Sequence, residues 1–382
     1  MLKRIRKFWV VLCVGCCAGW LLPASAQQVS DKHATKEAKR LFQRLYTLQS
    51  KYRIFGHQDA LAYGVGWKGI PGKSDVATVV GEHPGLMGWD IGHLELDAAK
   101  NLDDVPFDSM KQYIRQVHAA GSVITISWHL RNPLTGGSAW DTTHGTVASI
   151  LPGGSKHAVF NSWLDKVAVF MQDLKDDNGR YIPVLFRPFH EVTGNWFWWC
   201  KNNATAENIQ QLWRYTVQYL REQKKLHHLL YVYNTAEFAD AQAFLQYYPG
   251  DDVVDVMSFD QYQHEPVAQK QQFIQIMQQR VQVLCATAQS HKKIAALAET
   301  GMEAVPDPQW WTTVLLPIVE RYPLSYVLVW RNHGYMPSTG KMHYYGPYAG
   351  QVSAADFLRF YQHPVMLFQQ KLANQKVNKR KR

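Results

Sequence analysis

Eight short apolar runs, separated by segments of helix length, constrain the fold of this chain more than any other feature. The runs occupy residues 53–55, 85–89, 123–128, 182–186, 229–233, 253–259, 294–298 and 326–330. The run at 182–186 is apolar throughout, which is typical of a strand buried on both faces of a parallel sheet. The pattern therefore predicts an α/β protein built on parallel strands.

Amphipathic segments of helix length lie between and around these runs. They cover residues 32–50, 109–120, 159–175, 206–223, 269–289, 307–321 and 354–372. Eight strands alternating with helices over this length predict a single (β/α)8 TIM barrel, and a doubly wound open sheet is the alternative. Residues 64–69 match the dinucleotide-binding pattern G-x-G-x-x-G, but Ile70-Pro71-Gly72 follows and no helix can begin there. We interpret this segment as a flexible loop over the barrel mouth and expect no cofactor.

The first 26 residues have the organisation of a secretory signal peptide. Four basic residues precede an apolar stretch from Phe8 to Leu22, and a small-residue cleavage pattern ends at Ala26. The stretch is too short for a stable membrane span. A lipoprotein signal that uses Cys16 or Cys17 is the alternative, but the apolar stretch continues past both and a better cleavage site follows. We therefore expect secretion across the inner membrane to a periplasmic or extracellular location.

The net charge of +10 is concentrated at the two ends of the chain. Removing the four positive charges of the signal and the five of the tail after residue 375 leaves +1 for the body. A basic face that binds nucleic acid is therefore not expected. Two cysteines, Cys200 and Cys285, follow the signal; we expect two separate thiols, and one bridge in an oxidising compartment is the alternative. We divide the chain into the signal 1–26, one domain 27–373 and a basic tail 374–382 expected to be disordered, and we expect a monomer.

Polar and aromatic residues follow all eight predicted strands. In a barrel of this type the carboxyl ends of the strands form the catalytic face. These residues are Gly56-His57-Gln58-Asp59, Trp89-Asp90, Trp128-His129, Arg187 with His190 and Glu191, Asn234, Asp260-Gln261-Tyr262, Glu299-Thr300-Gly301 and Trp330-Arg331-Asn332-His333. A scaffold does not require such a set, so the pattern predicts an active site at this face.

Two glutamates stand out in this set. Glu191 follows the fourth strand and Glu299 follows the seventh, so they face each other across the barrel mouth. Glycoside hydrolysis needs such a pair, with one carboxylic acid and one carboxylate on opposite sides of the anomeric carbon. Each glutamate can also form a buried ion pair with Arg187 or Arg331, and that role does not exclude catalysis. Four aromatic residues at 196–199 and a total of 14 Trp are typical of proteins that bind sugar rings.

The stretch Arg187-Pro188-Phe189-His190-Glu191, followed by Gly194-Asn195-Trp196-Phe197-Trp198-Trp199, resembles the signature of glycoside hydrolase family 26, whose best-known members are β-mannanases. Segments 56–59, 259–262 and 298–301 are similar to other motifs of that family. The likeness extends from the first strand to the eighth.

The resemblance implies roles for individual residues. Glu191 matches the acid/base of the family and Glu299 matches its nucleophile. The positions that match sugar-contacting residues are His129, His190, Trp196, Tyr262, Trp330 and Arg331. Trp67 and Trp140 lie in loops where sugar subsites are built and are further candidates.

The resemblance also implies a retaining double displacement. Glu299 attacks the anomeric carbon while protonated Glu191 donates to the departing oxygen, and Glu191 then activates water. Glu191 therefore needs a raised pKa, which the aromatic residues at 196–199 and the charge of Glu299 favour. Glu299 must stay ionised, which Tyr262 and Arg331 can favour.

The expected partner is β-mannan, as mannan, glucomannan or galactomannan, cleaved at internal β-1,4 bonds or by release of mannobiose. Mixed-linkage β-glucan and β-1,3-xylan are alternative substrates.

A metal-dependent hydrolase is a second class of enzyme, suggested by His57, His93, His129 and His190. The first strand lacks a His-x-His spacing and the chain lacks H-E-x-x-H, so we expect no metal. A non-catalytic periplasmic sugar-binding protein is a third class, and it has no use for two opposed glutamates.

Overall fold

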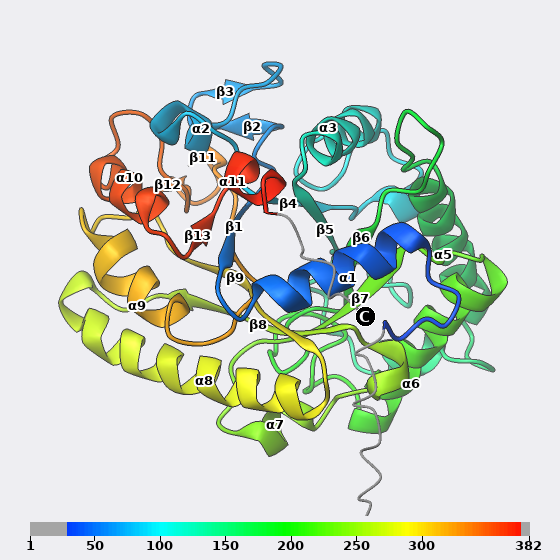
Figure 1. The fold of residues 1–382 in the computed structure, drawn as a ribbon. Coiled ribbons are helices and arrows are strands. Elements are labelled where there is room, and N and C mark those ends of the chain that lie inside the picture. Colours follow the sequence, from blue (N-terminus) through cyan, green and yellow to red (C-terminus); the bar gives the residue numbers. More distant parts are fainter. Residues whose placement is uncertain (1–28, 376–382) are drawn as a thin grey trace, which may run out of the picture.

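The computed structural model describes residues 29–375. The predicted signal 1–26 and the predicted tail from residue 376 onward lie outside the described residues. Eight parallel strands form a closed barrel, in which the last strand pairs with the first (Figure 1). The strands are β1 (Arg53–Gln58), β4 (Leu86–Asp90), β5 (Val123–Trp128), β6 (Val184–Pro188), β7 (Leu229–Thr235), β8 (Val256–Gln263), β9 (Ile294–Met302) and β10 (Tyr326–Val329). The predicted barrel is therefore confirmed, and each predicted strand overlaps one of these eight.

Helices follow most strands and cover the outside of the barrel. The longer ones are α3 (Phe107–Ala119), α5 (His157–Gln172), α6 (Ala206–Gln218), α8 (Lys270–Ser290) and α10 (Ala354–Gln362). Shorter ones are α2 (Asp75–Val80), α4 (Thr146–Ile150), α7 (Ala241–Leu245), α9 (Leu316–Val319) and α11 (Gln369–Ala373). The predicted segments 206–223 and 307–321 contain wider helical turns, η2 (Tyr219–Gln223) and η5 (Trp311–Leu315). None of the helices in residues 29–375 is long and apolar enough to cross a membrane.

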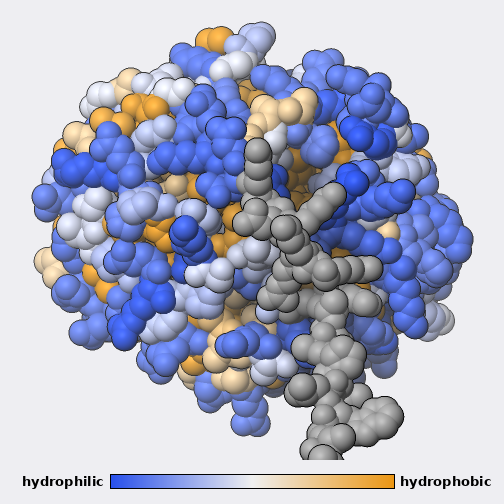
Figure 2. Space-filling model, viewed as in Figure 1, coloured by the Kyte–Doolittle hydropathy of each residue, from blue (hydrophilic) through white to orange (hydrophobic). Residues whose placement is uncertain are grey.

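Helix α1 (Lys36–Leu48) closes the amino end of the barrel. Thr35 caps it by accepting a hydrogen bond from the backbone N–H of Ala38 at 3.2 Å. Its buried face, which includes Phe42 and Leu45, packs in one cluster with inward residues of the strands, such as Leu185. Figure 1 shows α1 lying across the barrel. The surface in the same view is mostly hydrophilic, with scattered hydrophobic residues (Figure 2).

The strands alternate between the barrel interior and the helical layer, as the period of a β-strand requires. The inward residues are apolar near the amino ends: Ile54, Leu86, Val123, Leu185, Val232, Val256, Ile294 and Leu328. Outward residues such as Phe55, Met87 and Phe186 pack in the cluster that contains the surrounding helices. Both faces of each strand are therefore buried, which explains the continuous apolar runs. Near the carboxyl ends the inward residues become polar, and these residues build the site described below.

The structure corrects two local predictions. Residues 354–372 were expected to form one helix, but α10 ends at Gln362 and a short strand, β13 (Met366–Leu367), pairs with the start of β1 before α11 begins. The cause is Pro364, because proline forces the preceding residue out of the helical region; His363 has φ −60° and ψ 132°. Residues 64–69, expected to be a flexible loop, form a hairpin of β2 (Tyr63–Gly64) and β3 (Trp67–Lys68).

The two cysteines of the described chain are both buried and are not joined to each other. The expectation of two separate thiols is therefore confirmed.

Candidate active site

The end of β6 carries an arginine into the barrel and then turns sharply. Phe189 and Glu191 both adopt left-handed backbone conformations, with φ of 49° and 54°. This region is unfavourable for residues with a Cβ and is held in place by surrounding structure. One such restraint is the backbone N–H of Glu191, which donates to Asn234 Oδ1 at 2.7 Å. The turn directs the Glu191 side chain into the barrel mouth.

A β-bulge directs Glu299 into the same space. Along β9, Ile294, Ala296 and Ala298 face the barrel interior, so regular alternation would turn Glu299 outward. The pairing of β9 with β8 shifts at this point, because Phe259 lies opposite Leu297 whereas Asp260 lies opposite Glu299. The extra residue in β9 is a bulge, a feature that often re-aims a side chain beside an active site. Ala298 and Glu299 consequently both face the interior.

Both carboxylate oxygens of Glu299 accept hydrogen bonds. Arg187 Nη2 donates to Oε1, and the Tyr262 hydroxyl donates to Oε2 at 2.6 Å. Burial lowers the pKa of Arg187, but the charges of Asp260 and Glu299 outweigh it and hold that pKa above its usual value. Burial, followed by the charge of Glu299, raises the pKa of Tyr262 well above its usual value. Both donors therefore keep their protons, and each oxygen of Glu299 has a fixed hydrogen-bond donor.

Arg331 does not take part in this arrangement, although it was expected to help keep Glu299 ionised. It forms an ion pair with Asp103, in the segment before α3. Arg187 takes the expected place, because it is an inward residue of β6 and reaches Asp260 Oδ2 at 2.6 Å as well as Glu299. This prediction for Arg331 was therefore wrong, whereas Tyr262 contacts Glu299 as predicted.

The carboxyl group of Glu191 has a different environment. Its Oε2 accepts a hydrogen bond from Trp196 Nε1 at 2.6 Å. Burial, followed by the nearby charge of Glu299, raises the pKa of Glu191 to about 7, while the Trp196 bond and the charges of Arg187 and His129 oppose the rise. Near neutral pH this group therefore exists in both its protonated and its ionised form, which a group that gives and takes a proton requires.

Three carboxylates meet at the centre of the site. Glu191, Asp260 and Glu299 have oxygen atoms within 4.8 Å of one another. Oxygen donors of this kind suit a hard divalent cation. The guanidinium of Arg187, however, bonds both Asp260 and Glu299. A side-chain cation thus occupies the position between two of the three groups, and we assign no metal to them.

Two of the four histidines near the strand ends come together. His129 Nδ1 lies 2.7 Å from Asp90 Oδ2, and His129 Nε2 lies 3.0 Å from His190 Nε2. Burial lowers the pKa of His129, but the charge and hydrogen bond of Asp90 outweigh it, so the pKa is raised. Burial and the cationic His129 and Arg187 hold the pKa of His190 well below its usual value. His190 Nδ1 has no hydrogen-bond partner in residues 29–375.

The other two histidines have separate surroundings. His57 is a residue of β1 and is buried against Gly346. His93 precedes the short helix η1 (Leu94–Leu96) with a φ of 76°. Neither ring contacts His129 or His190 through an interaction in the described chain, so the metal-binding cluster considered from the sequence is not assembled there.

The four aromatic residues 196–199 do not form one wall. Trp196 is 38% exposed, whereas Trp198 and Trp199 are fully buried. Trp198 Nε1 donates to the backbone oxygen of Leu130, and Trp199 Nε1 donates to that of His190. These two rings therefore hold the backbone at His190 and at Leu130, the residue after His129. Trp196 alone presents an open indole beside Glu191.

The other predicted sugar platforms differ in exposure. The Trp330 ring is partly buried and lies 6.3 Å from His129. Trp140 is 52% exposed and stacks on His129 with a centroid distance of 5.4 Å. Trp67 is buried in the hairpin and donates to Asp75 at 2.6 Å, so it is not a surface platform. The open aromatic surface of the site thus comes from Trp140, Trp196 and Trp330.

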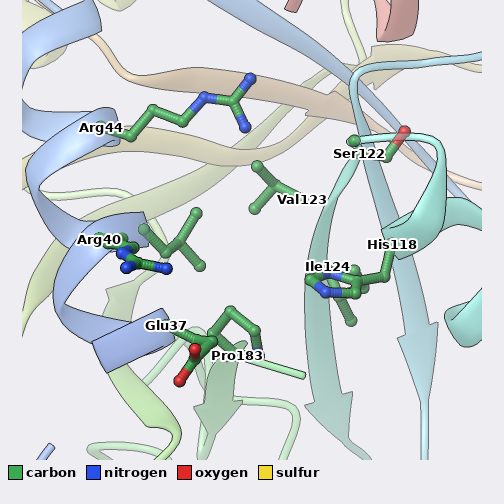
Figure 3. Close-up of a pocket in the computed structure, with 10 residues that line it drawn as sticks. Glu37, Arg40, Arg44, His118, Ser122, Val123, Ile124 and Pro183 are labelled. Carbon is green, nitrogen blue, oxygen red and sulfur yellow. The ribbon is translucent and has the colours of Figure 1, made fainter. Parts of the chain in front are cut away.

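A separate cavity of about 230 Å³ lies at the opposite end of the barrel. Arg40, Arg44 and Glu37 of α1 line one side of it, and Val123 and Ile124 at the start of β5 line the other (Figure 3). It lies at the amino ends of the strands, where barrels place stabilising contacts rather than catalytic groups. We therefore place the active site at the carboxyl face.

A closed (β/α)8 barrel with two opposed glutamates at the ends of β6 and β9 is the arrangement of barrel-type glycoside hydrolases. The comparison with known families agrees with this class, because residues 30–334 match the model of glycosyl hydrolase family 26. The chain belongs to this family.

Relatives and solved structures support the assignment. The chain is 31% identical over 351 residues to a mannan endo-1,4-beta-mannosidase of Bifidobacterium adolescentis, an alignment that covers 87% of this chain and 34% of that protein. It is 29% identical over 196 residues to the enzyme of the same name from Bacillus subtilis strain 168, covering 49% and 52% of the two chains. The chain thus spans about a third and about half of the length of these two relatives.

The fold is similar to solved family members over most of its length. A GH26 beta-mannanase from Bacteroides ovatus superposes with a TM-score of 0.83 at 45% identity, covering 87% of this chain and 95% of that chain. The catalytic domain of an endo-beta-1,4-mannanase from Bacillus sp. JAMB-750 gives a TM-score of 0.84 at 31% identity, covering 91% and 95%.

Proposed function

We propose that this chain is a retaining glycoside hydrolase that cleaves internal β-1,4 bonds of mannan, glucomannan or galactomannan. The observation that carries the proposal is the difference between two neighbouring carboxyl groups. Glu299 accepts a hydrogen bond on each oxygen, whereas the pKa of Glu191 is raised to about 7. Two neighbouring carboxyl groups in such different environments are suited to opposite roles.

Their spacing supports a retaining reaction. Retaining enzymes hold the two carboxyl groups about 5–5.5 Å apart, and inverting enzymes about 6.5–9.5 Å apart to admit a water. The oxygens of Glu191 and Glu299 that come closest lie within 4.8 Å of each other. The spacing in this site therefore agrees with the shorter one, that of retaining enzymes.

In the first step Glu299 attacks the anomeric carbon and forms a glycosyl-enzyme bond, while Glu191 transfers its proton to the departing glycosidic oxygen. In the second step Glu191, now ionised, takes a proton from water, and the resulting hydroxide displaces Glu299 from the sugar. Loss of the negative charge of Glu299 in the intermediate lowers the pKa of Glu191, because that charge was one cause of the rise. The same residue thereby changes from acid to base.

The substrate assignment rests on the relatives, which are mannan endo-1,4-beta-mannosidases. We propose that Trp196 and Trp330 stack against sugar rings on either side of the cleaved bond, and that His129 and His190 contact the sugar at the catalytic centre. Arg331, oriented by Asp103, is suited to contact a more distal sugar.

The test is the early product pattern on mannopentaose and on galactomannan. Internal cleavage predicts a rapid fall in viscosity and a range of oligosaccharides before mannobiose accumulates, and the anomeric proton resonances of new reducing ends should show the β form first. Release of the α anomer first would contradict the retaining mechanism. Absence of any new reducing ends from mannan, with activity on mixed-linkage β-glucan or β-1,3-xylan, would contradict the substrate.

We further propose that residues 1–26 direct secretion to the periplasm or the medium. Amino-terminal sequencing of the exported protein should then begin at Gln27, and a lipid-modified Cys16 or Cys17 would contradict this. A monomeric state stays a prediction, which light scattering of the purified protein tests.

A further inference from the structure

Asn234 lies at the end of β7, between the two halves of the catalytic site, and is fully buried. Its side chain makes three hydrogen bonds. Oδ1 accepts from the backbone N–H of Glu191 at 2.7 Å, and Nδ2 donates to Ser258 Oγ at 2.9 Å and to Asp260 Oδ1 at 2.7 Å. Both N–H donors of the amide and one of the two lone pairs of its oxygen are thus used.

The surroundings determine which way this amide points. Ser258 Oγ already donates its proton to the backbone oxygen of Tyr233 at 3.0 Å, so it acts as an acceptor toward Nδ2. The backbone N–H of Glu191 can only donate. The amide nitrogen must therefore face β8, and its oxygen must face Glu191.

The bond to Glu191 restrains an unfavourable backbone conformation. Glu191 has a φ of 54°, a region that a residue with a Cβ occupies only when its surroundings hold it there. A second contact joins the same two segments, because the backbone N–H of Val192 donates to the backbone oxygen of Asn234 at 3.3 Å. The side chain of Asn234 supplies the shorter of these two restraints.

Asn234 does not touch the other glutamate. The connection to Glu299 passes through Asp260 and Arg187, and Glu299 also has an independent donor in Tyr262. Loss of the Asn234 side chain therefore releases the backbone of Glu191 directly and leaves both hydrogen bonds of Glu299 in place.

We propose that Asn234 is a positioning residue that holds Glu191 at the distance and angle from which it protonates the departing sugar oxygen. This inference rests on the proposed role of Glu191 as acid. It predicts a defect in kcat/KM confined to substrates whose leaving group needs a proton, because kcat/KM reports the formation of the glycosyl-enzyme and the attack by Glu299 does not depend on Asn234. The second step uses Glu191 as base for every substrate, so kcat on either substrate is not the diagnostic quantity.

The experiment compares Asn234→Ala with wild type on two substrates. Mannopentaose has a sugar leaving group that requires protonation, and 2,4-dinitrophenyl β-mannobioside has one that departs without it. We expect kcat/KM on mannopentaose to fall about 10- to 100-fold, the scale of one lost hydrogen bond to a buried backbone group. On the aryl substrate we expect a fall of less than about threefold. Equal losses on both substrates would overturn the proposal.

Ser258→Ala is the matched control. Ser258 is equally buried and bonds the same amide, but it does not lie between Asn234 and Glu191. We expect this variant to change both substrates alike and only slightly. A leaving-group-dependent loss in Ser258→Ala as large as that in Asn234→Ala would contradict a specific role for the Glu191 bond.

Asn234→Asp covers the case in which the alanine variant does not fold. One oxygen of the aspartate still accepts from the N–H of Glu191, while the other meets Asp260 Oδ1 and the two carboxyl groups share a proton. The changed contact with Asp260 affects both substrates alike, so we expect both kcat/KM values to fall while their ratio stays near that of wild type. A large shift in that ratio would overturn the proposal. Failure of wild type to cleave mannopentaose would instead contradict the proposed function, so the two failures are distinguishable.

Discussion

Replacing Tyr262 with phenylalanine removes a single hydroxyl from the site. That hydroxyl donates to Glu299 Oε2 at 2.6 Å. The ring itself packs edge-on against Tyr345, with a centroid distance of 5.2 Å, and phenylalanine keeps this contact. The carboxylate of Glu299 retains its bond from Arg187 but loses the donor on its other oxygen.

The size of the effect follows from the type of bond that is lost. A hydrogen bond to a charged group contributes about 1.5–3 kcal/mol. Glu299 is buried, so solvent replaces the lost donor poorly. If the bond fixes the nucleophile for attack, this energy corresponds to a fall in kcat/KM of about 10- to 100-fold. Because the nucleophile acts on every substrate, the fall should be similar for mannopentaose and for 2,4-dinitrophenyl β-mannobioside.

The assay is steady-state hydrolysis of both substrates by Tyr262→Phe, with thermal unfolding to confirm that the variant is folded. Tyr345→Phe is the control, since it removes a hydroxyl from the neighbouring ring and leaves both hydrogen bonds of Glu299 in place. A fall of less than about threefold for Tyr262→Phe, or one restricted to mannopentaose, would refute the reasoning.

Two further predictions concern pH. Because the pKa of Glu191 is raised to about 7, kcat/KM on mannopentaose should decline above neutral pH. Trp196→Phe should move this decline to higher pH, since the Trp196 N–H favours the ionised form of Glu191. A decline at unchanged or lower pH in the variant would contradict the assignment of Glu191 as acid. Asp90 is buried, and burial raises its pKa, but the charge and hydrogen bond of His129 bring that pKa down to about 2. The stability that ionised Asp90 contributes is therefore present above about pH 4 and is lost as the pH falls toward 2. Urea unfolding between pH 5 and pH 2.5 should show that Asp90→Asn loses about 1.5 kcal/mol less over this range than wild type. Equal losses would show that the His129 contact does not hold Asp90 ionised.

The barrel could be predicted from the sequence because each strand is buried on both faces and therefore reads as an apolar run. The single helix expected over 354–372 was wrong although its signal was present, since Pro364 forces His363 into an extended conformation. Apolar spacing alone therefore does not locate helix ends, and the residue before a proline has to be considered as well.

The site was predictable to the extent that strand ends meet at one face. This rule brought Glu191, Glu299, Tyr262, His129 and His190 together correctly. It could not predict that Glu299 faces inward, because the alternation along β9 alone would turn it outward and only the shifted pairing with β8 reverses this.

The sequence also could not predict which carboxylate each arginine pairs with. The choice between Arg187 and Arg331 as the partner of Glu299 depends on which side chain reaches it. Arg187 points inward from β6 and bonds Glu299, whereas Arg331 pairs with Asp103 in a separate segment. The roles of Asn234 and Asp260 arise in the same way, from contacts between neighbouring strands whose residue types alone do not reveal them.

Trapping with azide tests the central claim, the assignment of opposite roles to Glu191 and Glu299. With 2,4-dinitrophenyl β-mannobioside, Glu299→Gly should be reactivated by azide and release the α-mannobiosyl azide, because azide enters the space of the lost nucleophile. Glu191→Ala should instead release the β-mannobiosyl azide, because azide then displaces Glu299 from the glycosyl-enzyme. The opposite pair of configurations, or no glycosyl azide from either variant, would contradict the account.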